Sequence, residues 1–239
     1  MANGAGNTDN TDIRYTMWSV FRAATPIDAD GRGDRIASTE RQRVASEVDQ
    51  VLEEAEAKGV TTRGTYDTGG FRADADVMFW WVAEEPDALQ DVYARFRRTT
   101  FGRCCEPVFS VLGVHRPAEF NKAHVPAFVE GKDPRRYLCV YPYDRSYEWY
   151  LLDPAERRDM LAEHGQMARP FPDVNANTVA SFALSDYEWI LAFEADEPHR
   201  LTDLMRNLRG AAARRHTRLE VPFYTGSRKP MSEIVAALP

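Results

Sequence analysis

The sequence has few cysteines, no long apolar run and no excess of basic residues. Three cysteines, Cys104, Cys105 and Cys139, occur among 239 residues. Their odd number and the absence of a CxxC spacing argue against a disulfide framework and a zinc site. No apolar run approaches the roughly 20 residues that span a bilayer, and residues 1–12 lack the basic and apolar regions of a secretion signal. These absences predict a cytoplasmic protein with reduced thiols.

Charge and missing motifs exclude several functional classes. Lysine and arginine number 30 against 37 aspartates and glutamates, which gives a net charge of −7. An acidic chain is poorly suited to bind nucleic acid or an anionic membrane surface, so neither partner is expected. The sequence also lacks the GxGxxG, Walker A, GxSxG and HExxH patterns. Binding of a dinucleotide or nucleoside triphosphate, serine hydrolysis and zinc proteolysis are therefore not indicated.

Hydrophobic residues make up 44% of the chain and aromatic residues 11%, which is typical of a folded globular protein. Short aromatic and β-branched runs alternate with stretches of helical periodicity. The segment 77–82, VMFWWV, is apolar at successive positions and should be buried on both faces. Strands are expected at 15–21, 61–67, 77–82, 137–143, 146–152, 179–185 and 187–194; helices are expected from a cap at Thr39 to a stop at Gly59, from Pro86, from a cap at Asp153 to about 168, and from Pro198.

An internal repeat organises these elements. The stretch Glu85–Val92 matches Glu197–Leu204 in pattern, and an aromatic strand precedes each copy. Two β-α-β-β-α units predict an α+β fold in which two ferredoxin-like halves form one barrel with helices outside, or else two separate domains. The expected divisions are a disordered tail (1–12), an N-terminal half (13–106), a connecting loop that forms a pocket wall (107–136) and a C-terminal half (137–239).

Tyr141 is the first candidate functional residue. In a strand over 137–143, Leu138, Val140 and Pro142 share the face that suits packing under helices, so Tyr141 should point to the opposite side, into a cavity. It is either a structural tyrosine with a buried hydroxyl partner or a phenol that loses an electron and a proton near an oxidising metal. Arg145, four residues later, could hold a carboxylate nearby.

Two histidines are further candidates. His164 lies on an apolar helix face with Met160, Leu161 and Met167, where it is either a satisfied core histidine or an axial ligand to haem iron. His124 lies in the long loop, where it is either a surface residue or a general base with the ordinary histidine pKa of about 6.5.

Four segments carry a resemblance to a known family. They are the run 141–152, YPYDRSYEWYLL; the helical Glu163-His164-Gly165; the stretch 185–189, SDYEW; and the late 222–226, PFYTG. Together they resemble the coproheme decarboxylases, which are hydrogen-peroxide-dependent haem synthases in the chlorite dismutase-like superfamily. The resemblance covers nearly the whole chain after about residue 12, and a histidine at 124 is similar to the actinobacterial branch.

The resemblance implies a fold, a function and a set of roles. The fold would be a dimeric-type α+β barrel, with haem bound in the C-terminal half (137–239). The expected reaction is the oxidative decarboxylation of iron coproporphyrin III (coproheme) to haem b by hydrogen peroxide, through a three-propionate intermediate and a tyrosyl radical. This is the last step of coproporphyrin-dependent haem biosynthesis. His164 would be the proximal iron ligand, Tyr141 the radical-forming residue, His124 the distal base and Arg145 a residue beside a propionate. A homopentamer is implied, with transient contact to the ferrochelatase that supplies coproheme.

Two departures from the family pattern affect the choice among related activities. Chlorite dismutases carry a distal arginine and firmicute decarboxylases a glutamine, but 174–178, VNANT, holds neither. This argues against chlorite chemistry and gives His124 more weight. Tyr143 stands where many relatives have Met or Phe, and the sequence assigns it no consequence. The alternatives are a haem peroxidase, a chlorite dismutase-like enzyme, and a non-catalytic α+β barrel that binds a small molecule.

Overall fold

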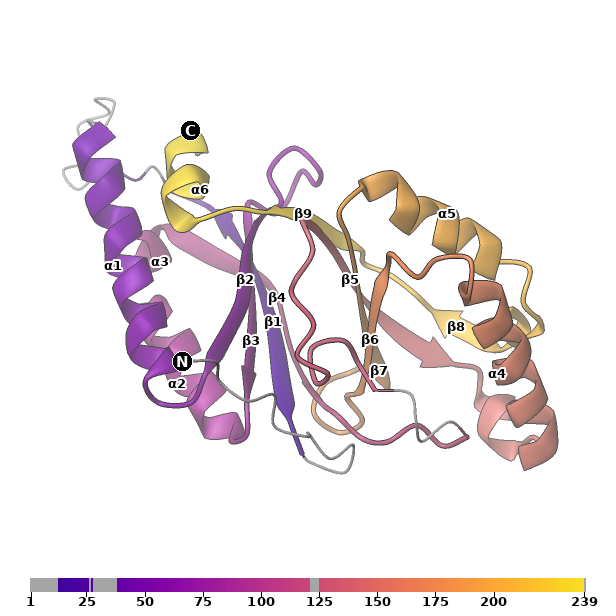
Figure 1. Ribbon diagram of the computed structural model, residues 1–239. Coiled ribbons are helices and arrows are strands. Elements are labelled where there is room, and N and C mark those ends of the chain that lie inside the picture. The colour runs from indigo at the N-terminus through magenta and orange to yellow at the C-terminus, as the bar shows by residue number, and fades with distance from the viewer. Residues whose placement is uncertain (1–12, 26, 28–37, 121–124, 239) are drawn as a thin grey trace, which may run out of the picture. The chain divides into compact units, whose positions relative to one another are not determined.

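The computed structural model describes residues 13–25, 27, 38–120 and 125–238 (Figure 1). The chain forms two compact units. The N-terminal unit contains Arg14–Leu112 together with Thr225–Pro239, and the C-terminal unit is built on Gly113–Tyr224. The last 15 residues therefore group with the first half of the chain, whereas the sequence placed them with the second.

The N-terminal unit is an antiparallel sheet with the strand order β4-β1-β3-β2-β9. Strand β3 lies between β1 and β2, with Trp18 opposite Trp80 and Tyr66 opposite Met78. Every residue of β3 except one is buried, which confirms that VMFWWV is covered on both faces. The strands are β1 (Tyr15–Ala23), β2 (Thr61–Asp67), β3 (Val77–Ala83), β4 (Cys105–Val114) and β9 (Tyr224–Arg228).

Helices cover one face of this sheet. Phe21 and Phe79 pack with Phe96 of α2, at ring-centroid distances of 4.8 and 4.6 Å. Helix α6 joins the same core through Ile234 and Val235. Helix α1 starts at Ser38, so Thr39 lies inside the helix and the expected cap is wrong, whereas Gly59 has the positive φ of +88° expected of a helix stop. The helices are α1 (Ser38–Glu56), α2 (Pro86–Phe96), α3 (Thr100–Cys104) and α6 (Met231–Ala237).

The C-terminal unit is a second antiparallel sheet, with the order β6-β7-β5-β8. Strands β6 and β7 form a hairpin, with Asn175 opposite Glu194 and Ala180 opposite Trp189. The first strand was expected at 179–185, and this is wrong because β6 ends at Ala180. Its strands are β5 (Tyr137–Arg145), β6 (Asn175–Ala180), β7 (Trp189–Ala195) and β8 (Thr217–Leu219); its helices are α4 (Pro154–Ala168), α5 (Pro198–Leu208) and the 3-10 helices η1 (Tyr147–Leu151) and η2 (Ala212–His216).

The element order confirms the α+β class and the repeat. Each unit contains a β-α-β-β-α succession. The N-terminal unit adds two strands that the sequence did not indicate, β4 and β9, and the C-terminal unit adds one, β8. The interpretation of 107–136 as a loop is wrong at its start, because β4 continues to Val114. Pro107 and Gly113 within that strand hid it, since both residues are depleted in strands. Within the described residues, no helix is long and apolar enough to cross a bilayer.

The segment Ser146–Leu152 was expected to be a strand, and this is wrong. Residues Tyr147–Leu151 form η1, in which the N–H of Trp149 bonds to the carbonyl of Ser146 at 3.1 Å. Trp149 is buried, while Tyr147 and Leu151 are 74% and 86% exposed. A 3-10 helix has three residues per turn, so Ser146, Trp149 and Leu152 share its inner side. Aromatic residues at alternate positions also fit a strand, which explains the misreading.

Helix α4 begins as the sequence predicts. Asp153 is the N-cap, its carboxylate accepts the N–H of Ala155 at 2.8 Å, and Pro154 occupies the first turn. We expect Asp153→Ala to lower the free energy of unfolding by about 1 kcal/mol, since the cap bond is lost and nothing replaces it. Urea unfolding followed by circular dichroism measures this. Asp159→Ala, at an exposed mid-helix position, is the control, and equal losses in the two variants would contradict the capping role.

Candidate active site

The sheet face that carries Tyr141 packs against helices, contrary to the expectation. Tyr141 is 2% exposed and belongs to a cluster with Leu201 and Leu204 of α5. The opposite face, with Leu138 and Val140, is equally buried. Alternation along a strand separates its residues into two faces, but it does not say which face the helices cover when both are apolar.

Tyr141 is held by aromatic and sulfur contacts. Its hydroxyl lies 3.5 Å from Sδ of Met205, and its ring lies 4.5 Å from that of Phe223 between centroids. Burial, with a smaller contribution from nearby Cys139, raises the pKa of Tyr141 well above 10. The phenol therefore stays protonated at any physiological pH. A thioether is a weak hydrogen-bond acceptor and no base, so the described residues fix the ring without taking its proton.

Arg145 ends β5 with its guanidinium over two aromatic rings. Its central carbon lies 4.1 Å from the Trp149 ring centroid and 4.8 Å from that of Tyr143. Its Nη1 donates to the carbonyl oxygen of Ala213 at 3.3 Å. Among the described residues, no carboxylate forms an ion pair with this guanidinium, and burial lowers its pKa. The site therefore contains a partly desolvated positive charge that Glu188 attracts without forming an ion pair, which favours an anionic ligand.

His164 lies on the second turn from the end of α4. The side chains of Met160, Leu161, His164 and Met167 are each half-buried, and no residue of α4 is fully buried. Burial, then the positive charge of Arg145, lowers the pKa of His164 below 6.5. Because the pKa is lowered, the His164 imidazole binds a proton less readily in the folded chain than in the unfolded chain. It therefore stays neutral to a lower pH than an ordinary histidine does. The imidazole is neutral at pH 7, as a metal ligand must be.

The structure places three of the four predicted residues in the C-terminal unit: Tyr141 and Arg145 on β5, and His164 on α4. Arg145 and His164 are close enough for the charge of one to affect the titration of the other. Tyr141 contacts α5, and α5 is tied to α4 by a 2.6 Å bond from Nδ2 of Asn207 to the carbonyl of Met167. Figure 1 shows α4 and α5 on the same side of this unit's strands.

His124, the fourth predicted residue, lies outside the described residues. The segment that follows it is anchored to β6. The N–H of Phe128 donates to Oδ1 of Asn177 at 2.9 Å, and that of Ala127 to the carbonyl of Ala176 at 3.4 Å. Ala176 belongs to the same apolar layer as Tyr141. The described end of the long loop therefore lies beside β6, whose Ala176 packs against the cluster that contains Tyr141.

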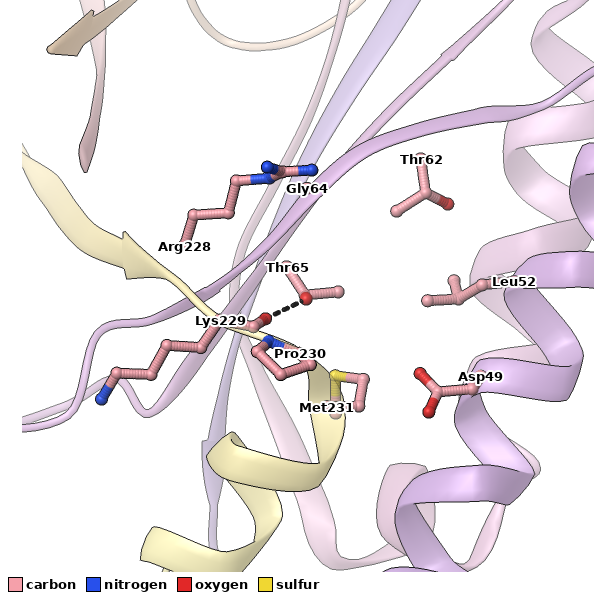
Figure 2. Close-up of a pocket in the computed structure, with 9 residues that line it drawn as sticks. All are labelled: Asp49, Leu52, Thr62, Gly64, Thr65, Arg228, Lys229, Pro230 and Met231. Carbon is pink, nitrogen blue, oxygen red and sulfur yellow. Dashed lines mark hydrogen bonds between the residues drawn. The ribbon is translucent and has the colours of Figure 1, made fainter. Parts of the chain in front are cut away.

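A separate pocket of about 370 Å³ lies in the N-terminal unit. Figure 2 shows Asp49 and Leu52 of α1 on one side of it and the segment Arg228–Met231 on the other. Burial, with the charge of Glu53, raises the pKa of Asp49. Of the predicted site residues that the structure describes, none lines this pocket.

The residues of the C-terminal unit fit an iron porphyrin. Haem iron takes a neutral imidazole in an apolar wall, and the half-covered apolar side of α4 offers one at His164. Propionates take a guanidinium, and Arg145 has no ion-pair partner among the described residues. The donor set therefore matches a flat apolar ligand with a central metal and anionic edges.

Sequence reasoning missed the partners of Arg145. Trp149 follows Arg145 by four residues, a spacing that brings the two side chains together once 147–151 is helical. This spacing could be read from the sequence, but the segment was assigned as a strand and the contact was therefore missed. Thr217 and Ala213, which also surround the site, lie about 70 residues further on and have no local sequence signal.

Comparison with known proteins identifies the family of this chain. The chlorite dismutase family model matches residues 41–229. A coproheme decarboxylase of Mycolicibacterium smegmatis is 54% identical over 231 residues, which are 96% of each chain. A chlorite dismutase of Ideonella dechloratans is 26% identical over 215 residues, 85% of this chain and 74% of that protein. The solved chlorite dismutase of Candidatus Nitrospira defluvii in complex with imidazole shares the fold, with a TM-score of 0.79, 23% identity and coverage of 93% and 94%.

The chain belongs to the chlorite dismutase family. Within that family, its high identity over almost its full length is to a coproheme decarboxylase, which confirms the resemblance read from the four sequence segments.

Proposed function

We propose that the protein converts iron coproporphyrin III to haem b with hydrogen peroxide, the last step of coproporphyrin-dependent haem biosynthesis. The observation that carries the proposal is the proximity of a neutral imidazole, His164, to a buried guanidinium, Arg145, that forms no ion pair within the described residues. The coproheme decarboxylase at 54% identity supports it. A metal ligand beside an anion-binding group suits a metalloporphyrin with carboxylate edges better than it suits chlorite alone.

The reaction consumes one hydrogen peroxide for each propionate that is decarboxylated. Each propionic acid side chain loses carbon dioxide and two hydrogens and becomes a vinyl group, while one hydrogen peroxide becomes two waters. Two propionates react in turn, so the product after one round keeps three. The iron porphyrin supplies the redox chemistry once bound, and the protein supplies binding, orientation and control of protons.

His164 is proposed to hold the iron from one face. Its lowered pKa keeps the imidazole available at neutral pH and below. Arg145 is proposed to bind a propionate by charge-assisted hydrogen bonds, which fixes the porphyrin edge relative to β5.

Tyr141 is proposed to be the redox-active residue. It gives up an electron to the peroxide-oxidised substrate iron porphyrin and loses its phenolic proton, and the phenoxyl group then takes a hydrogen atom from the β-carbon of a bound propionate. The resulting carbon radical loses a second electron to the same iron porphyrin and releases carbon dioxide, which leaves the vinyl group. The hydroxyl of Tyr141 lies 3.5 Å from the thioether sulfur Sδ of Met205. The proton therefore leaves to a group that arrives with the substrate or to solvent, because a thioether does not accept it.

His124 is proposed to take the proton of peroxide on the other side of the iron. An imidazole is a competent base while it is neutral and loses this capacity once it is protonated. We expect the rate of wild type to fall on acidification, and we expect His124→Ala to be slower than wild type at neutral and alkaline pH and to lack that fall. Initial rates from pH 5.5 to 9 measure this. Superimposable profiles would show that His124 is not the base.

Location and assembly are part of the proposal. We propose a cytoplasmic homopentamer that receives coproheme through transient contact with a ferrochelatase.

The reaction is tested by mixing the purified chain with coproheme and stepwise additions of peroxide, then reading product masses. Expected is the ordered appearance of a three-propionate and then a two-propionate porphyrin, complete at about two peroxides per coproheme. Consumption of peroxide with coproheme unchanged would overturn the proposal in favour of a peroxidase. Oxygen release from added chlorite is measured in parallel as the test for chlorite dismutase activity.

A further inference from the structure

Tyr143, for which the sequence offers no role, lies at the side chain of Arg145. It precedes Arg145 by two residues on β5, so both side chains leave the same face of the strand. The Arg145 guanidinium lies 4.8 Å from the centroid of this ring, and the Trp149 ring of η1 lies 4.1 Å away. Two rings from two different elements therefore contact one cation.

Both rings are themselves anchored. The hydroxyl of Tyr143 lies 3.0 Å from Oγ1 of Thr217, and Thr217 is the β8 residue paired with Arg145. The Trp149 ring packs on His216 at a centroid distance of 5.5 Å. Because both rings are anchored, they restrict the orientations that the Arg145 guanidinium can adopt.

Aromatic faces stabilise a cation without neutralising it. A carboxylate in the same place would form an ion pair and occupy the in-plane N–H groups. A stacked guanidinium keeps those groups at its edge free to donate to an incoming anion. The contact at Ala213 uses one of them at a long 3.3 Å. The aromatic pair thus offsets part of the desolvation of the charge and leaves its hydrogen-bonding capacity available.

We propose that Tyr143 is a positioning residue for the substrate: with Trp149 it holds the Arg145 guanidinium in the direction that receives a porphyrin carboxylate. This rests on the proposed function, since the carboxylate is that of coproheme. Tyr143 does not touch the reacting carbon in this account; it acts through Arg145.

The test is a double-mutant cycle read by spectral titration with coproheme. Tyr143→Met removes the ring and keeps a flexible side chain that fills the space; Arg145→Met removes the charge. We expect Tyr143→Met to weaken coproheme binding about tenfold in the wild-type background and less than twofold in the Arg145→Met background. Tyr143→Phe, which keeps the ring, should restore affinity to within about threefold of wild type.

A second readout does not need porphyrin. In protein labelled with ¹⁵N-arginine, the Arg145 Nε–H signal should be sharp and exchange slowly with water in wild type and Tyr143→Phe, and it should exchange faster in Tyr143→Met. It is assigned by its loss in Arg145→Met.

The outcomes separate the two proposals. An equal loss of affinity in both backgrounds would mean that Tyr143 acts through packing, and it would overturn this inference while the proposed function stands. Unchanged Nε–H exchange in Tyr143→Met would overturn it too. Failure of the wild-type chain to bind coproheme at micromolar concentration would overturn the proposed function, and this inference with it. Coupled affinity losses together with faster exchange would establish the positioning role.

Discussion

Tyr141→Phe is expected to bind coproheme with near wild-type affinity and to form no haem b. The ring contacts with Phe223 and Phe193 survive the change, and the hydroxyl lost has only a weak sulfur partner at 3.5 Å. The fold should therefore be retained, while the oxidisable O–H group is removed. Product masses after addition of peroxide measure the outcome.

Tyr137→Phe is the matched control for this prediction. Tyr137 lies on the same face of β5 and is half-buried, so its substitution perturbs a similar environment. It should form haem b at close to the wild-type rate. Haem b formation at the wild-type rate by Tyr141→Phe would show that the phenol is not part of the reaction. Loss of activity in both variants would show that the strand, rather than Tyr141, is sensitive.

His164→Ala is expected to remove the protein ligand to the iron. Alanine is the strongest helix former, and His164 makes no hydrogen bond within the described residues, so α4 should persist. The Soret band and the spin-state signals of the coproheme complex should change, and turnover should fall by at least a hundredfold. Added imidazole should restore part of the wild-type spectrum.

The control for His164 is His199→Ala, an exposed histidine at the start of α5. It should leave the spectrum of the complex as in wild type. An unaltered spectrum in His164→Ala would remove that residue from the iron site.

Regular periodicity made most elements of the fold predictable. The start of α4 followed from Asp153 and Pro154, and strand β3 followed from the apolar run 77–82. Such signals are local, since caps, turns and alternation depend on neighbours in sequence.

Elements whose stability comes from distant partners were missed. Strand β4 contains Pro107 and Gly113 and was not assigned, while α6 is a seven-residue helix held against α1. Arg41 donates to the carbonyl oxygens of Val235 and Leu238, nearly 200 residues away. Tertiary contacts of this range decide such segments against their local propensity.

In the candidate site, the residues could be predicted from the sequence, but their long-range contacts could not. Tyr141, Arg145 and His164 could be proposed from the sequence because their residue types suit haem chemistry and the resemblance assigned their roles. The contacts that define what Arg145 can do could not. Thr217 and Ala213 reach it from more than 65 residues away, and Trp149 required the correct assignment of η1.

The most direct test of the central claim is a crystal structure of the chain with coproheme bound. The account predicts a bond between the iron and the His164 imidazole, a propionate on the Arg145 guanidinium, and the Tyr141 hydroxyl in contact with a propionate of the same porphyrin. A porphyrin that touches only one of Tyr141 and His164, with the other facing a different space, would contradict it.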